Sequence, residues 1–381
     1  MTTILIKNGS IQNPGKPQIQ GDILVKDGKI AEIGNISAQN KDAAVIDAKG
    51  CLITPALIDQ HLHGGYDCNF NTAGVDEILN FLENLPKHGI ASICPTIMTD
   101  KPENIKAQIK KIVEAKRKTP DTSAKIVGIN IEGPFINPEY RGAHSKELCL
   151  TPTIDSYKQF EHKEIKIITI APELDKDLEL TKYLADKGVI VSAGHTNASA
   201  DRISVAKDAG LSQITHIFNG MPPLHHRQPG IVGKSLIEDS LYVEAIADNH
   251  HLHPDIINLI LRTKPKDKVI FVSDSLPLAE SSNKSTVFGG QMIFKSDEVA
   301  INEEGRFAGS LMMLDAVIRK NANAVNFADL LMYCAYNPAK NLGLKDCGVV
   351  KKGTSADIAV WDAKTLEIRA TLINGNLCYT K

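Results

Sequence analysis

The sequence lacks the features that would tie a protein to a membrane or to nucleic acid. No apolar run approaches the roughly 18 residues that suggest a membrane span. No long block of basic residues occurs, and the formal net charge is −2. The start of the chain shows no basic-then-apolar signal segment. We therefore expect neither a membrane nor a nucleic acid as a partner.

Paired cysteines are also lacking. The seven cysteines are scattered, odd in number and never arranged as CxxC, which is typical of reduced thiols in a cytoplasmic protein. There is no internal repeat and no low-complexity segment. A chain of 381 residues with ordinary globular composition is long enough for one large domain and a small one.

The two ends of the chain have a similar β pattern. The first fifty residues contain short alternating runs broken by Gly, Asn and Asp, and the last thirty repeat this pattern around Asn374-Gly375. Such runs predict short strands joined by tight turns. We expect the segments 1–54 and 348–381 to pair into one small β domain.

Between these segments, residues 55–347 alternate apolar strand-like runs with helix-period stretches such as VDEILNFLENLPKHG. The runs are Leu57–His61, Ile90–Thr96, Ile126–Ile131, Ile165–Ile170, Val189–Ala193, Gln213–Ile217, Tyr242–Ala247 and Val269–Val272. Continuous apolar runs separated by helices predict buried parallel strands, and eight of them favour a closed (β/α)8 barrel over an open sheet. Residues 285–308 break the rhythm and suggest a hairpin insertion.

Polar residues follow these runs where the strands should end. They are His61, His63, Glu132, His195, His216 and Asp274. The carboxyl ends of barrel strands meet at one mouth, and residues at i and i+2 of a strand face the same side. The first five therefore make a candidate site for Zn²⁺, Fe²⁺, Mn²⁺ or Co²⁺.

An isolated His-x-His pair is more often a surface or core feature than a pair of metal ligands. Here it becomes stronger evidence for a metal site because all five residues are expected at the same end of the barrel. Five ligands exceed one tetrahedral site. Either two ions share Glu132, or one ion leaves some of the five in an outer shell. Asp274, after the eighth run, would suit a general base, and its alternative is a helix-capping or turn aspartate.

Several motifs together resemble one known family. They are DQHLHGG, Pro95-Thr96, NIEGPFINPEYRGAH, SAGHTNA, THIFNGMPPLHHRQPG, ADNHHLHP, FVSDS and GRFAGS. The chain resembles the N-acetylglucosamine-6-phosphate deacetylases of the amidohydrolase superfamily nearly end to end. The resemblance implies a (β/α)8 metal-dependent barrel with a small β-sandwich formed by both termini. It also implies removal of acetate from an N-acetylated amino sugar phosphate.

The resemblance also implies roles for individual residues. Glu132, His195 and His216 would hold the principal metal, His61 and His63 with Glu132 a second one, and Zn²⁺ is favoured. Asp274 would be the catalytic base. Substrate contacts are implied for His144, which would also polarise the amide carbonyl, and for Asn219, Gly220, His251 and Ala308. Arg227 would reach the phosphate bound in the neighbouring subunit of a homodimer.

The sequence departs from the family pattern at Ala56, where Gly is usual, and in SDSLPLAE after Asp274. Three alternatives stay open. The protein could deacetylate N-acetylgalactosamine 6-phosphate, or be another amidohydrolase, such as one acting on cyclic amides. It could also be a non-catalytic sugar-phosphate-binding or metal-storage protein. The six other histidines, His88 among them, are expected to be surface or capping residues.

Overall fold

The computed structural model describes residues 3–36 and 43–381, so residues 1–2 and 37–42 of the predicted β domain lie outside the described residues. Both chain ends enter one eight-stranded sheet, the terminal sheet, in which β21 pairs antiparallel with β5. Its strands are β1 (Ile4–Ile11), β2 (Ile19–Lys26), β3 (Lys29–Gly34), β4 (Ala44–Asp47), β5 (Cys51–Pro55), β21 (Ile358–Asp362), β22 (Ile368–Ile373) and β23 (Asn376–Thr380).

The terminal sheet divides at β1, which pairs with β4 near its start and with β5 near its end. Apolar side chains from both chain ends, including Ile6, Ile53 and Val360, fill one core within it. The predicted small β-sandwich is therefore confirmed. Its boundaries at residues 54 and 348 stay a prediction, although β5 ends at Pro55, directly before the first barrel strand.

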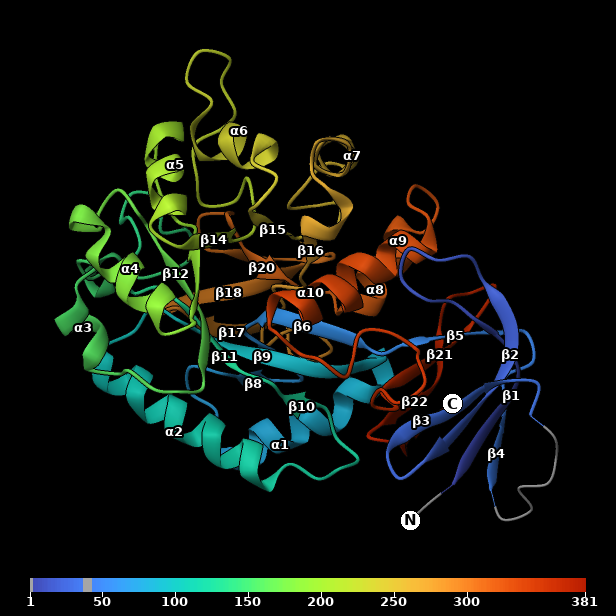
Figure 1. Ribbon diagram of the computed structural model, residues 1–381. Coiled ribbons are helices and arrows are strands. Elements are labelled where there is room, and N and C mark those ends of the chain that lie inside the picture. The colour runs from blue at the N-terminus through green and yellow to red at the C-terminus, as the bar shows by residue number, and fades with distance from the viewer. Residues whose placement is uncertain (1–2, 37–42) are drawn as a thin grey trace.

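The barrel is built from eight parallel strands, one for each predicted apolar run (Figure 1). They are β6 (Leu57–Leu62), β9 (Ile90–Met98), β11 (Ile129–Glu132), β12 (Ile165–Ile170), β13 (Ile190–Ala193), β14 (Leu211–Ile214), β15 (Tyr242–Ala245) and β16 (Val269–Phe271), with the short β10 (Lys125–Ile126) beside β9. Backbone hydrogen bonds close the circle. Asp274 N donates to His61 O at 3.0 Å, and His63 N donates to Ser275 O at 2.8 Å.

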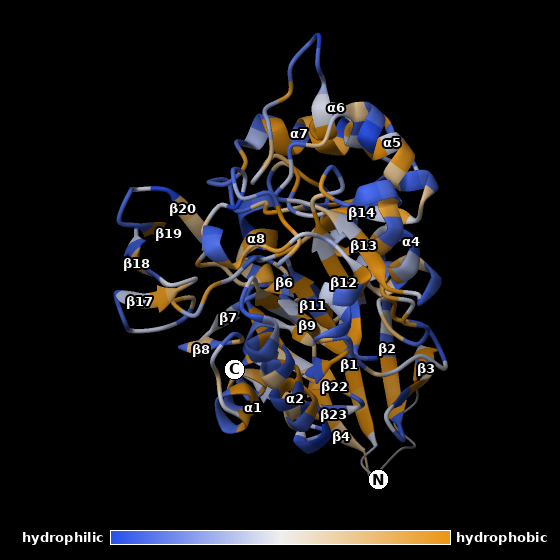
Figure 2. Cartoon of the chain, turned by 90° about the vertical axis from the view of Figure 1, so that its left-hand side faces the viewer, coloured by the Kyte–Doolittle hydropathy of each residue, from blue (hydrophilic) through white to orange (hydrophobic). Residues whose placement is uncertain are grey.

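Helices cover the outside of the barrel (Figure 1). They are α1 (Val75–Asn84), α2 (Pro102–Lys118), α3 (Ile154–Lys158), α4 (Glu179–Asp186), α5 (Ala200–Asp208), α6 (Gly230–Ile237), α7 (Pro254–Thr263), α8 (Leu314–Asn321), α9 (Phe327–Leu331) and α10 (Asn337–Asn341). In α2, Ile105, Ile109 and Ile112 recur at helical spacing and are buried. Figure 2 shows the hydrophobic colour along the barrel strands. Within the described residues, no helix is long and apolar enough to cross a membrane.

The predicted hairpin insertion is a four-stranded antiparallel sheet, which we call the flap. Its strands are β17 (Ser285–Phe288), β18 (Gln291–Ser296), β19 (Val299–Asn302) and β20 (Phe307–Ser310), and a two-stranded ribbon of β7 (Gly64–Gly65) and β8 (Cys68–Asn69) follows β6. The unusual Leu276 and Leu278 after Asp274 pack against Phe288 and Ile293 of the flap. This departure from the family pattern therefore anchors the flap beside the barrel mouth.

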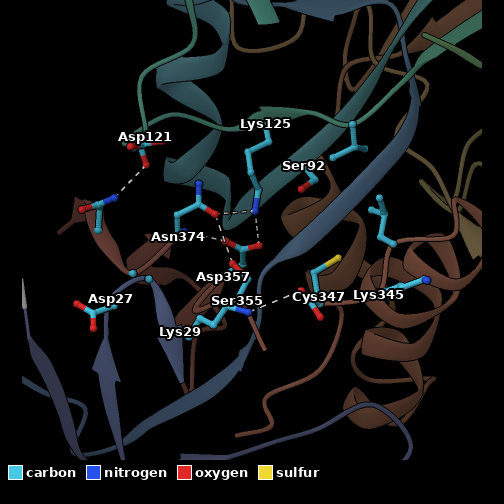
Figure 3. Close-up of a pocket in the computed structure, with 16 residues that line it drawn as sticks. Asp27, Lys29, Ser92, Asp121, Lys125, Lys345, Cys347, Ser355, Asp357 and Asn374 are labelled. Carbon is cyan, nitrogen blue, oxygen red and sulfur yellow. Dashed lines mark hydrogen bonds and ion pairs between the residues drawn. The ribbon is translucent and has the colours of Figure 1, made fainter. Parts of the chain in front are cut away.

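An ion pair joins the barrel to the terminal sheet at the opposite end. Lys125 Nζ lies 2.5 Å from Asp357 Oδ2, and Asn374 Oδ1 accepts a second hydrogen bond from the same nitrogen at 3.2 Å (Figure 3). Ala56, the other departure, is buried here and donates its N–H to Asp357 O at 3.0 Å. The junction fixes the chain just before β6, the strand that carries His61 and leads into His63.

Candidate metal centre and active site

All six polar residues predicted at strand ends lie at the carboxyl mouth of the barrel. His61 is in β6 and His63 just follows it, Glu132 ends β11, His195 and His216 lie two residues beyond β13 and β14, and Asp274 lies three residues beyond β16. Each is buried. The structure therefore brings together side chains that are as much as 213 positions apart in the sequence (274 − 61).

Three of these residues have left-handed backbone conformations. The φ angles are 47° at His195, 24° at His216 and 48° at Asp274. Positive φ is uncommon for residues other than glycine and costs free energy, and such strain clusters at functional sites. The turns that end β13, β14 and β16 thus hold their side chains in positions that an ordinary turn would not give them.

Glu132 is at the centre of the cluster. Its Oε1 lies 2.8 Å from His216 Nε2, 3.0 Å from His195 Nε2 and 3.5 Å from His61 Nε2. Its Oε2 lies 3.1 Å from His63 Nε2. Both carboxylate oxygens therefore face imidazole nitrogens, with His195 and His216 on one oxygen and His63 on the other.

The hydrogen bonds on the far side of two rings determine which nitrogen carries the proton. His195 Nδ1 lies 2.8 Å from the carbonyl oxygen of Tyr140, and His61 Nδ1 lies 3.0 Å from Glu244 Oε2. Carbonyl and carboxylate oxygens only accept, so both Nδ1 atoms donate, and in the neutral form of each ring Nε2 carries a lone pair on the side of Glu132. Buried His61 Nε2 has no hydrogen-bond partner. Converging lone pairs of this kind fit a bound cation.

The charges around the centre fit a divalent cation too. Glu132, Asp274 and Glu244 are all buried, and in the described part of the chain their ion-pair partners are imidazoles, never Lys or Arg. Buried carboxylates need compensating positive charge. Burial opposes ionisation of Glu132, yet the surrounding imidazoles, His61 first, hold its pKa well below its ordinary value.

Protons would compete with a cation at His63. Burial works to lower the pKa of His63, but hydrogen bonds to Asp274 and Glu132 outweigh it and raise that pKa to about 9. Asp274 Oδ1 lies 3.3 Å from His63 Nε2 and 3.6 Å from His61 Nε2. Burial also opposes ionisation of Asp274, but His63 and His61 lower its pKa below the ordinary value. Asp274 is therefore a carboxylate at neutral pH and can accept a proton.

His144 has the opposite tautomer. The backbone N–H of Thr99 donates to His144 Nδ1 at 3.3 Å, so the proton of the neutral ring lies on Nε2, which is 3.3 Å from Glu132 Oε2. Burial is the main cause that lowers the pKa of His144 to about 4. At neutral pH His144 therefore offers an N–H donor to the centre, where His61 and His195 offer lone pairs.

Most of the predicted substrate contacts line one cavity with the cluster. Asn219, Gly220, His251 and Ala308 surround it together with His144, and Phe288 and Phe307 of the flap complete the wall. Gly220 has φ +62°, and a Cβ there would lie 2.6 Å from His195 Nδ1, so only glycine allows this close approach. The structure gathers these residues, while their roles stay predictions.

Arg227 is the exception. It is exposed and lies in the loop between β14 and α6, which projects from the molecule in Figure 1, and it does not line the cavity of its own chain. A single chain therefore does not test the predicted reach into a neighbouring subunit.

Sequence reasoning missed three residues that support the site. Glu244 holds His61, Thr99 orients His144, and Asp248 Oδ2 binds His251 Nδ1 at 2.8 Å. Glu244 is a single charge within the apolar run 242–247, and Asp248 directly follows that run. Either position could have been noticed. Among the other histidines, His253 caps α7 as expected, whereas His88 is buried beside Asp315, so its expected surface or capping role was wrong.

A closed (β/α)8 barrel with imidazoles and carboxylates converging at its carboxyl mouth defines a protein of the metal-dependent hydrolase class. The chain belongs to the amidohydrolase family, whose sequence model matches residues 52–378.

Individual relatives agree with this. The chain is 31% identical to the N-acetylglucosamine-6-phosphate deacetylase of Bacillus subtilis strain 168, over 99% of this chain and 97% of that protein. It is 29% identical to an N-acetylgalactosamine-6-phosphate deacetylase of Escherichia coli O157:H7, over 93% of each. A solved structure of an aspartate-to-alanine mutant of the Mycobacterium smegmatis N-acetyl-D-glucosamine-6-phosphate deacetylase, in complex with N-acetyl-D-glucosamine-6-phosphate, matches with a TM-score of 0.90. It is 26% identical and is covered, like this chain, over 100% of its length.

Proposed function

We propose that this protein hydrolyses the acetamide bond of N-acetyl-D-glucosamine 6-phosphate, giving acetate and D-glucosamine 6-phosphate. The observation that carries the proposal is the buried cluster in which Asp274 and the His144 N–H face the same imidazole-ringed centre. The B. subtilis and M. smegmatis relatives, which carry this activity in their names, support the choice of substrate.

A metal ion belongs to this proposal. Glu132, His195 and His216 would hold the principal ion, and His61 and His63 would share Glu132 with a second one; Zn²⁺ suits these ligands best. A divalent cation supplies Lewis acidity, which lowers the pKa of water and polarises a carbonyl oxygen. The converging lone pairs of His61 and His195 support this assignment.

The chain's own groups would carry the proton transfers. Asp274 takes a proton from the attacking water as the new C–O bond forms, and His144 Nε2–H donates to the carbonyl oxygen as it gains negative charge. When the C–N bond breaks, Asp274 returns the proton to the departing nitrogen. Water thus supplies one of the two oxygens of acetate and, through Asp274, a proton of the amine.

The remaining contacts would fix the sugar phosphate. His251, held by Asp248, and the backbone at Ala308 would contact the sugar. Asn219 and Gly220 would contact the phosphate. Arg227 of a second subunit would complete the phosphate site in a homodimer, because a guanidinium suits a phosphate dianion. The scattered reduced thiols favour a cytoplasmic location.

The E. coli relative keeps the galactosamine epimer as a second candidate substrate. The test is acetate release from both N-acetylated sugar 6-phosphates by one purified sample whose metal content is measured. We expect metal-dependent release, faster from the gluco epimer. Faster release from the galacto epimer would reverse the choice of substrate. No release from either at any metal content would favour the non-catalytic alternative.

A further inference from the structure

Glu244 is a charged residue inside the barrel that no family motif of this sequence includes. It lies in β15 and is 0% exposed. A carboxylate in a barrel interior is costly unless donors surround it, and an apolar residue would fill the space more cheaply. Its presence among the buried strands therefore needs a reason other than folding.

The hydrogen-bond donors around Glu244 form a chain in which each amide N–H points toward the carboxylate. Gln60 Nε2 and Gln213 Nε2 donate to its Oε1 at 2.7 and 2.9 Å. Asn341 Nδ2 in turn donates to the amide oxygens of Gln60 and Gln213, at 3.1 and 2.6 Å. Because Asn341 engages both amide oxygens, the amide nitrogens must face Glu244.

The other oxygen of Glu244 is thereby left for His61. Its Oε2 accepts from His61 Nδ1 at 3.0 Å, so in the neutral ring Nε2 keeps the lone pair. That Nε2 faces Glu132 Oε1 at 3.5 Å and Asp274 Oδ1 at 3.6 Å. The pairing of β6 with β9 is irregular between Asp59 and Leu62, and both Gln60 and His61 reach the interior network.

The other imidazoles do not depend on this network. His195 Nδ1 is held by a backbone carbonyl, which no side-chain substitution removes. Buried His63 Nδ1 and His216 Nδ1 have no hydrogen-bond partner in the described structure. Glu244 therefore acts on one ligand alone, and that ligand belongs to the second of the two proposed ion positions.

We propose that Glu244 is the positioning residue for the second cation, and that its hydrogen bond to His61 sets whether the protein binds one divalent ion or two. The proposal rests on the two-ion site of the proposed function. Removing a carboxylate that orients a metal-binding histidine typically lowers metal affinity by about 10- to 100-fold.

The decisive variant is Glu244→Gln. Gln60 and Gln213 would still donate to one side of residue 244 and so select its amide oxygen, which turns the amide N–H₂ toward His61 Nδ1. Nδ1 would then have to accept, and the ring proton would move to Nε2, which could no longer bind a cation. We expect wild type dialysed against Zn²⁺ to hold two ions per subunit and the variant to hold one.

The measurement is zinc content by mass spectrometry, with the affinity of each ion obtained by titration against a chelating dye. Gln213→Met is the matched control: it removes a donor of the same network but keeps the Glu244–His61 pair, and we expect it to hold two ions. General damage to the barrel would lower the affinity for both ions, whereas loss of positioning lowers one.

Two ions in Glu244→Gln at wild-type affinity would overturn the proposal, as would equal weakening of both ions or a wild type that holds one. If Glu244→Gln does not fold, Glu244→Asp keeps the charge on a shorter arm. We expect it to weaken the second ion at least about tenfold with the first unchanged, and any other pattern overturns the proposal. Zinc is counted without substrate, so selective loss of one ion in a protein that releases no acetate would leave the positioning role intact and remove the proposed function.

Discussion

The two ends of the barrel both gather charged side chains, but in opposite ways. At the carboxyl mouth, three buried carboxylates form ion pairs with imidazoles alone among the described residues, and Nε2 of His61 and of His195 point to a common centre. At the other end, a cavity of about 710 Å³ lies between the barrel and the terminal sheet. Figure 3 shows Lys125 there already paired with Asp357 and Asn374.

The size of a cavity therefore does not mark the site in this molecule. In the larger cavity the central charged side chains are paired with one another, so this cavity is a structural junction between the barrel and the terminal sheet. The mouth has nitrogens whose protons are directed elsewhere by Tyr140 and Glu244. Converging polar atoms without hydrogen-bond partners indicate a ligand site, whereas polar atoms already paired with one another indicate a structural contact.

The strongest test of this contrast is Asp274→Asn. The amide cannot take a proton from water, so we expect kcat to fall by about 10³-fold or more while the fold and the bound metal persist. Acetate release and metal content measured together would show this. Turnover near that of wild type would remove Asp274 as the base and weaken the distinction between the two ends.

A second test asks whether Arg227, which is exposed and outside the cavity of its own chain, takes part in binding phosphate. Arg227→Ala should raise KM for the sugar 6-phosphate by about 10- to 100-fold, since a charge-assisted contact to phosphate is lost, with little effect on unphosphorylated N-acetylglucosamine. Gln228→Ala in the same exposed loop is the control. Equal effects of Arg227→Ala on both substrates would exclude a phosphate contact.

The smallest effect is expected at the junction. Lys125→Met leaves buried Asp357 without its cation, and we expect it to lower the free energy of unfolding by about 2 kcal/mol, a value discounted for partial exposure of the lysine. Denaturant titration would measure this, with kcat and metal content unchanged. Lys345→Met, at a lysine that lines the same cavity with no ion pair in the described structure, is the control. A loss of activity in Lys125→Met would show that the two ends are coupled.

The sequence was sufficient for the parts of the molecule that follow from periodicity. Each apolar run became a barrel strand, and the polar residues after the runs met because parallel strands share one carboxyl edge. The charge of Glu244 within an apolar run could have been noticed, but its role depends on His61 of β6 and on Asn341 of α10, which lie far from it in the sequence. Such a convergence has no local signal. The predicted reach of Arg227 into a second chain stays a prediction, because one sequence does not position a partner.

The left-handed turns at His195, His216 and Asp274 have a consequence for how this barrel can be improved. Glycine and asparagine adopt positive φ at a lower cost in free energy, so a sequence selected for stability alone would have one of them at these positions. Here three residues with positive φ are also residues whose side chains face the centre. Stabilising substitutions should therefore be sought around the terminal sheet and the outer helices, because relief at these three turns would remove side chains of the proposed active site.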